Sequence, residues 1–188
     1  MPNLPRSLEL SSKDDTRLLI VDMQEKFVPV IDEIDRVIEN CVKLLKGASI
    51  LSVPAGTTEQ YPKGLGNTIP EIAEHLGEDI PEKLEFSCLN ALDWAERSDD
   101  SEDRSRVIVA GIETHVCIQQ TTLDLLAHGF RVYIPVDAVS SRKPLDREIA
   151  LQRMADSGAV LTTTEAILFE LCQTAAAPEF KEISRLVK

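Results

Sequence analysis

The stretch VIVAGIETHVCIQQTTLDLLAHG, residues 107–129, joins an apolar run to a helical pattern and carries a cysteine near the junction. The run VIVA at residues 107–110 is typical of a strand that is buried on both faces of a sheet. A helix is expected over residues 114–128, after a turn that contains a glycine. The stretch therefore predicts a strand, a turn and a helix, the unit that builds parallel sheets.

Strand and helix patterns alternate along the rest of the chain. Strands are expected at residues 17–22, 48–54, 83–86, 106–111 and 131–136, and residues 159–168 are expected to be a last strand that turns into a helix. The other helices are expected at residues 29–46 (closed by Gly47), 71–76, 91–98, 114–128, 145–157 (followed by Gly158) and 178–188. This alternation implies parallel strands joined by right-handed helical crossovers, which is an α/β fold. Residues 1–15 are expected to form a polar arm and residues 16–188 a single domain.

Charge and cysteine content exclude several classes of protein. The chain of 188 residues has 20 Lys and Arg against 32 Asp and Glu, a net charge of −12, which repels phosphate backbones and anionic membranes. No apolar run approaches the ~20 residues that span a bilayer, and no signal-peptide pattern opens the sequence, so a cytoplasmic location is expected. The widely spaced cysteines form no CxxC motif and predict neither a disulfide framework nor a zinc site. They are Cys41, Cys88, Cys117 and Cys172.

In a parallel α/β sheet, ligands bind beyond the carboxyl ends of the strands, and Cys117 falls at such an end. Thr114 is a candidate N-cap, which would place Cys117 at the third helical position, near unpaired N–H groups that favour a thiolate. A buried cysteine that packs as a small hydrophobe would occupy the same position. The spacing alone leaves both interpretations open.

Asp22 and Lys83 are candidate partners for this thiol. Asp22 closes the strand LLIVD, where a charge must be paired or solvated, although it could also cap a helix or bond to loop amides. Lys83 enters the expected third strand, where an isolated lysine is more commonly an exposed edge residue. Together, an aspartate could deprotonate Cys117 while a lysine keeps the carboxylate ionised and stabilises the thiolate.

The chain resembles the isochorismatase-like hydrolases through five motifs that occur in the same order: LLIVDMQEKF, PEKLEFS, VIVAGIETHVC, VDAVSSR and LTTTEAIL. Within that family it resembles most closely the isochorismatase domain-containing proteins, through TTEQYPKGLG and GIETHVCIQQT. The resemblance implies three layers, with helices on both faces of an open, mostly parallel six-stranded sheet, and a homo-oligomer. It assigns Asp22, Lys83 and Cys117 as the catalytic residues. It also implies a non-proline cis peptide bond between Ile112 and Glu113, which would orient the backbone amides of the oxyanion hole.

The oxyanion hole is expected to use the backbone amides of Cys117 and its neighbour Val116.

Nicotinamidases in the family bind a metal through an aspartate and two histidines after the second strand. The corresponding loop here, VPAGTTEQYPKGLG, has neither residue type, so no metal and no cofactor is expected. Isochorismatases proper cleave a vinyl ether and lack the cysteine. Cys117 therefore favours hydrolysis of a small amide or other carbon–nitrogen substrate through an acyl-enzyme. The alternative is a non-hydrolytic interaction protein, or a redox-responsive one, that retains the fold.

Other polar and aromatic residues near the strand ends have two possible roles each. Gln24 and Phe27 could line the substrate pocket, with core packing as the alternative for Phe27. Gln60 could hydrogen-bond an amide substrate or stabilise a turn. His115 is expected to point away from Cys117, because two steps along a helix rotate a side chain by about 200°. Cys88 lies near the site but matches no catalytic position, whereas Cys41 and Cys172 are expected in the core.

Overall fold

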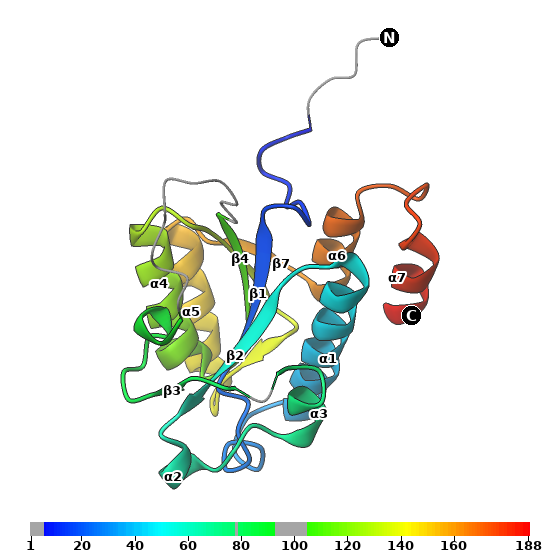
Figure 1. Cartoon of the computed structure of the whole chain (residues 1–188). Helices are drawn as coiled ribbons and strands as arrows, with labels where there is room; N and C mark the ends of the chain where they lie inside the picture. Colours follow the sequence, from blue (N-terminus) through cyan, green and yellow to red (C-terminus); the bar gives the residue numbers. More distant parts are fainter. Residues whose placement is uncertain (1–5, 78, 93–104) are drawn as a thin grey trace.

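A computed structural model of the chain describes residues 6–77, 79–92 and 105–188. Its centre is a parallel sheet with the strand order β3-β2-β1-β4-β5-β7, and a short strand, β6, pairs with β4 beside this path (Figure 1). The strands are β1 Thr16–Val21, β2 Ala55–Gln60, β3 Glu82–Lys83, β4 Arg106–Ile112, β5 Arg131–Pro135, β6 Val139–Ser140 and β7 Val160–Thr162. The predicted α/β class and six-stranded parallel sheet are confirmed, with one additional strand.

Helices cover both faces of the sheet and complete the three predicted layers (Figure 1). One face carries α1 Ile34–Leu51, α3 Pro70–Ala73, α6 Thr164–Cys172 and α7 Phe180–Leu186, and the other carries α4 Gln119–Ala127 and α5 Pro144–Asp156. Three short helical turns lie in connections: α2 Pro62–Leu65, the 3₁₀ turn η1 Leu89–Ala91 and the π-helical turn η2 Thr114–Ile118. In the described part of the chain, no helix is both long and apolar enough to cross a bilayer.

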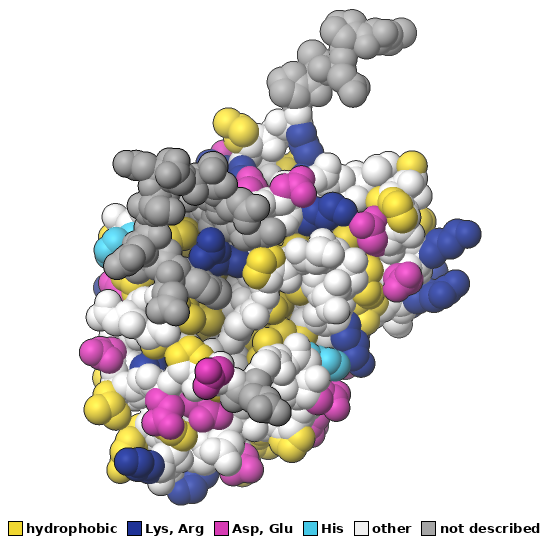
Figure 2. Space-filling model, viewed as in Figure 1, with side chains coloured by type: hydrophobic (Ala, Val, Ile, Leu, Met, Phe, Trp, Pro, Cys, Tyr) yellow, Lys and Arg dark blue, Asp and Glu magenta, His cyan; other side chains and the backbone are white. Residues whose placement is uncertain are grey.

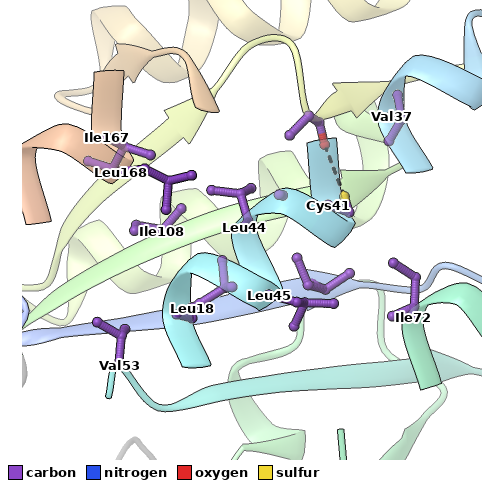
Figure 3. Packing of buried hydrophobic residues seen from close by; sticks show 14 of the residues in the cluster. Leu18, Val37, Cys41, Leu44, Leu45, Val53, Ile72, Ile108, Ile167 and Leu168 are labelled. Atoms are coloured by element: carbon purple, nitrogen blue, oxygen red, sulfur yellow. Dashed lines mark hydrogen bonds between the residues drawn. The ribbon is translucent and has the colours of Figure 1, made fainter. Parts of the chain in front are cut away.

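The two hydrophobic cores follow from the alternation of side chains along β1. Leu18 and Ile20 belong to the core beneath α1, α6 and α7, whereas Leu19 and Val21 belong to the core beneath α4 and α5. Figure 3 shows Leu18 close to the apolar side chains that α1 directs towards the sheet. Because both faces of β1 are buried, its sequence is a continuous apolar run rather than an alternating one.

Two of the four cysteines are core residues, as the sequence predicted. Cys41 is fully buried on α1, and its thiol donates to the carbonyl oxygen of Ala138 at 3.6 Å (Figure 3). Burial raises the pKa of the Cys41 thiol well above its ordinary value, so this group stays a neutral thiol. Cys172 is 5% exposed at the end of α6. Both side chains act as small hydrophobes in the core beneath α1.

The second strand lies later than the sequence predicted. Residues 48–51, expected to begin a strand, are the last turn of α1, and the strand is the polar segment AGTTEQ of β2. Gly47 does not end α1, because its missing side chain leaves room for Leu168: a Cβ there would lie 2.3 Å from Leu168 Cδ2. The helix ends at Ser52, which adopts a left-handed conformation with φ 58°.

Other boundaries differ less. Helix α1 begins at Ile34 rather than at residue 29, and the third strand is only the pair Glu82–Lys83. The helix expected at residues 91–98 falls outside the described residues from position 93 onward. Strands β1, β4 and β5 and helices α5 and α7 lie where the sequence predicted them, to within two residues at each end.

Candidate active site

The three predicted catalytic residues lie at one edge of the sheet. Asp22 follows β1, Lys83 ends β3, and Cys117 lies in the turn η2 after β4. Because these strands are parallel, their carboxyl ends meet at the same edge. Lys83 Nζ reaches across β2 to within 2.7 Å of Asp22 Oδ2, and each of the two side chains is 1% exposed. The structure thus forms a buried ion pair at this edge.

The ammonium group of Lys83 has a full set of acceptors. It donates to Asp22 Oδ2, to Gln60 Oε1 at 2.8 Å and to the carbonyl oxygen of Phe86 at 3.1 Å. Burial by itself lowers the pKa of Lys83, but the negative charge of Asp22, with that of any nearby thiolate, outweighs burial and raises this pKa above its ordinary value. Lys83 is therefore a fixed positive charge at neutral pH.

Cys117 is 3% exposed, and the Asp22 carboxylate acts electrostatically on its thiol. Burial, and then the Asp22 charge, raise the pKa of Cys117 far above its ordinary value, while Lys83 partly opposes this shift. The resting thiol is consequently protonated. It becomes a thiolate only when a neighbouring group takes its proton, and Asp22 is the carboxylate whose charge acts on it.

The turn between β4 and Cys117 is built differently from the prediction. The peptide bond between Ile112 and Glu113 is trans, so the predicted cis bond is wrong. The chain turns instead through positive φ angles, 117° at Gly111 and 55° at Glu113. A Cβ at Gly111 would lie 2.3 Å from the carbonyl oxygen of Val21, so glycine is required where β4 passes the end of β1. This close approach brings the turn beside Asp22.

The start of the helix also departs from the prediction. Thr114 is not its N-cap, since Glu113 precedes the helix and the Thr114 hydroxyl is buried without a hydrogen-bond partner among the described residues. The backbone N–H of Val116 donates to the Glu113 carbonyl oxygen at 2.9 Å. Val116 is therefore not free to hold an oxyanion in this conformation, which corrects that assignment.

The two glutamines predicted to contact substrate are both engaged within the protein. The amide nitrogen of Gln24 donates to the carbonyl oxygens of Gln60 and Gly66, and its oxygen accepts from the Gln60 N–H. The Gln60 side chain bridges Lys83 and the Leu84 carbonyl oxygen. These contacts fix the loop after β2 and the position of Lys83, and direct contact with substrate stays a prediction for both glutamines.

Phe27 is half-buried and packs against the core beneath α1. Core packing was the alternative that the sequence left open for this residue. Its role in a substrate pocket stays a prediction.

Thr58 is a site residue to which the sequence analysis gave no role. Its hydroxyl donates to Asp22 Oδ1 at 2.8 Å and lies 3.4 Å from Cys88 Sγ. Both Thr58 and Cys88 are fully buried. The polar segment AGTTEQ could have indicated this role. Polar side chains that are buried on a strand need hydrogen-bond partners, and the partners of Thr58 are Asp22 and Cys88.

His115 belongs to a separate polar cluster. Its Nδ1 lies 3.0 Å from Ser141 Oγ and 3.2 Å from Glu113 Oε2, and Glu113 Oε1 accepts from Arg142 Nε at 2.8 Å. These contacts are with the loop after β6 and with the turn before η2. They support the expectation that His115 is not the base that serves Cys117.

Within residues 6–77, 79–92 and 105–188, no group of three or more His, Cys, Asp or Glu side chains is arranged to hold a metal ion.

Comparison with known proteins places the chain in a family. The isochorismatase domain model matches residues 16–166. Over 188 residues the chain is 42% identical to isochorismatase domain-containing protein 2 of Homo sapiens and covers 88% of its length. It is 45% identical to isochorismatase domain-containing protein 1 of Salmo salar over 167 residues, which are 89% of this chain but only 59% of that relative. The chain belongs to the isochorismatase-like hydrolase family.

A solved structure agrees with this assignment. The structure of MAR1 ribonuclease from Caenorhabditis elegans superposes with a TM-score of 0.83 at 40% identity, covering 95% of this chain and 92% of that one. The similarity therefore extends over nearly the whole chain.

Proposed function

We propose that the chain is a cysteine hydrolase that cleaves a small amide or related carbon–nitrogen substrate. One observation carries the proposal: the buried Cys117 thiol lies beside a carboxylate, Asp22, which raises its pKa and is itself held by Lys83 at 2.7 Å. A nucleophile, a proton acceptor and a fixed cation thus meet at the edge of the sheet where ligands bind in this class of fold.

In the proposed first half-reaction, Asp22 takes the proton from Cys117, and the thiolate attacks the carbonyl carbon of the substrate. The positive charge of Lys83 stabilises the negative charge as it moves from the carboxylate to the sulfur. Asp22 then returns the proton to the leaving nitrogen, the carbon–nitrogen bond breaks, and the acyl group stays on sulfur as a thioester.

In the second half-reaction, Asp22 takes a proton from water, and the hydroxide attacks the thioester carbon. The carbon–sulfur bond breaks, the proton returns to sulfur, and the free acid leaves. Of the two amides expected to hold the oxyanion, that of Val116 already donates to Glu113, so the proposal keeps the backbone N–H of Cys117.

Burial supports a small substrate. Cys117 is 3% exposed and Asp22 is 1% exposed, so only a compact group can approach the sulfur without a large rearrangement. The name of the C. elegans structure raises RNA as another substrate class. The net charge of −12 opposes RNA binding, and Figure 2 shows acidic and basic side chains interspersed on the face in view, without a separate basic patch.

Labelling with iodoacetamide at neutral pH tests the proposal. We expect peptide mapping by mass spectrometry to find the modification on Cys117 before any other cysteine, because Asp22 can take the proton of Cys117. Asp22→Asn removes the proton acceptor and is expected to slow this labelling by at least about a hundredfold, the scale of general-base contributions.

Asp137→Asn is the matched control, since Asp137 also follows a strand but bonds to Thr164. Cys117 labelling in this variant should match the unmodified chain. Equal labelling of all four cysteines, or a rate at Cys117 that Asp22→Asn leaves unchanged, would favour the interaction or redox-responsive alternative instead.

A further inference from the structure

The buried hydroxyl of Thr58 lies between the Asp22 carboxylate and a second thiol, Cys88. We propose that Thr58 is a positioning residue for proton transfer: its hydroxyl holds ionised Asp22 in place and then reverses its direction, towards Cys88, when Asp22 takes the proton. This proposal rests on the proposed function, because it concerns the step in which Cys117 loses its proton.

The direction of each hydrogen bond follows from counting protons. An ionised carboxylate only accepts, so Thr58 must donate its single hydroxyl proton to Asp22 Oδ1, at 2.8 Å. The 3.4 Å contact between Thr58 Oγ1 and Cys88 Sγ then requires Cys88 to be the donor. Burial raises the pKa of Cys88, which keeps the required proton on its sulfur. The resting chain runs from Cys88 through Thr58 to Asp22.

After Cys117 transfers its proton, the Asp22 carboxyl group carries one proton and can donate a hydrogen bond as well as accept one. Lys83 occupies Oδ2 at 2.7 Å, and its positive charge opposes a second proton there. Oδ1 is then the oxygen that can hold the proton, provided that Thr58 stops donating to it. A hydroxyl can do this by rotating about its C–O bond, because it is both a donor and an acceptor.

The reversed chain keeps every proton paired. Asp22 Oδ1 donates to Thr58 Oγ1, the Thr58 hydroxyl turns to Cys88 Sγ, and the Cys88 proton turns towards the neighbouring hydroxyl of Thr121. Thr121 already accepts from the Cys88 backbone N–H at 2.9 Å, which anchors Cys88 at this point. No covalent bond besides those to the transferred proton is made or broken.

Thr58→Val and Thr58→Ser test the proposal through the second-order rate constant for iodoacetamide labelling of Cys117 at neutral pH. Valine keeps the shape of threonine without its hydroxyl and is expected to slow labelling by about tenfold, the effect of losing a hydrogen bond to a charged group. Serine keeps the hydroxyl, so its rate should stay within about threefold of the unmodified chain. If Thr58 had only a structural role, the labelling rates of the two variants would instead fall in step with their melting temperatures.

Thr57→Val is the matched control, because Thr57 is the buried neighbour on β2 and donates to the carbonyl oxygen of Ile20 at 2.7 Å, away from Asp22. It removes a similar hydrogen bond, so it is expected to lower the melting temperature without changing the labelling rate. Equal rates for Thr58→Val and Thr57→Val would overturn the proposal.

Cys88 variants keep the test informative if Thr58→Val fails to fold. Cys88→Ala removes the acceptor of the reversed chain and should slow labelling of Cys117 by about threefold, whereas Cys88→Ser should not slow it. An unchanged rate in Cys88→Ala would also overturn the proposal. Failure of the proposed function is a separate result, since the unmodified chain would then show no preference for Cys117 at all.

Discussion

Lys83→Met is expected to lower the free energy of unfolding by about 3–5 kcal/mol and to abolish preferential labelling of Cys117. Methionine has a similar length but leaves Asp22 as a buried carboxylate without its counter-ion, and both side chains of this pair are 1% exposed. It also leaves Gln60 Oε1 and the Phe86 carbonyl oxygen without their donor. Urea unfolding at neutral pH, followed by circular dichroism, measures the first effect.

Lys43→Met provides the matched control. Lys43 Nζ also lies 2.7 Å from a carboxylate, Glu39 Oε1, but this pair is on the surface, where Glu39 is 65% exposed. We expect a much smaller change there, because solvent screens an exposed ion pair. The double variant Asp22→Asn/Lys83→Met should regain part of the lost stability, since it no longer buries a lone charge. If Lys83→Met and Lys43→Met lower the free energy of unfolding equally, the buried ion pair does not contribute the stability assigned to it.

Gly111→Ala is the second substitution with a large expected effect. Its φ of 117° is unfavourable for a residue with a side chain, and the new Cβ would lie 2.3 Å from the backbone oxygen of Val21, which cannot move without shifting β1. Strain and overlap together should lower the free energy of unfolding by at least about 3 kcal/mol. Because Asp22 follows Val21, labelling of Cys117 should slow as well.

Gly158→Ala separates the two causes. Gly158 has a comparable φ of 106°, but nothing lies within 4 Å of the position that a Cβ would take. This variant therefore measures backbone strain alone, with an expected cost of about 1–2 kcal/mol and no change in Cys117 labelling. Equal losses in stability for the two alanine variants would show that the contact between β4 and β1 does not require glycine.

Much of the fold could be predicted because burial and sequence pattern agree. Strands β1 and β4 are buried on both faces and have continuous apolar runs, so they were found. Strand β2 was missed because its buried side chains are polar: Thr57 bonds to the Ile20 carbonyl oxygen and Thr58 to Asp22. Their burial depends on neighbouring strands, which a local pattern does not reveal.

The sequence predicted which three residues meet at the sheet edge, but it did not predict how the turn before Cys117 is built. Asp22, Lys83 and Cys117 stand at strand ends in the sequence, and the parallel sheet brings these ends together. The turn before Cys117 depends on contacts with β1 at Gly111, so its π-helical start could not be derived from local spacing. The cis peptide bond that the family resemblance implied is absent, and the bond has the ordinary trans form. The role of Thr58 likewise exists only through residues distant in sequence.

The central claim is that Cys117 forms an acyl-enzyme with the help of Asp22. Rapid-quench kinetics with p-nitrophenyl acetate, followed by intact-mass and peptide analysis, tests it most directly. We expect a stoichiometric burst of p-nitrophenolate and an acetyl group on Cys117, with no burst in Cys117→Ala and one at least about a hundredfold slower in Asp22→Asn. Acetyl groups on lysines or other cysteines in place of Cys117, or a burst that survives in Cys117→Ala, would contradict it.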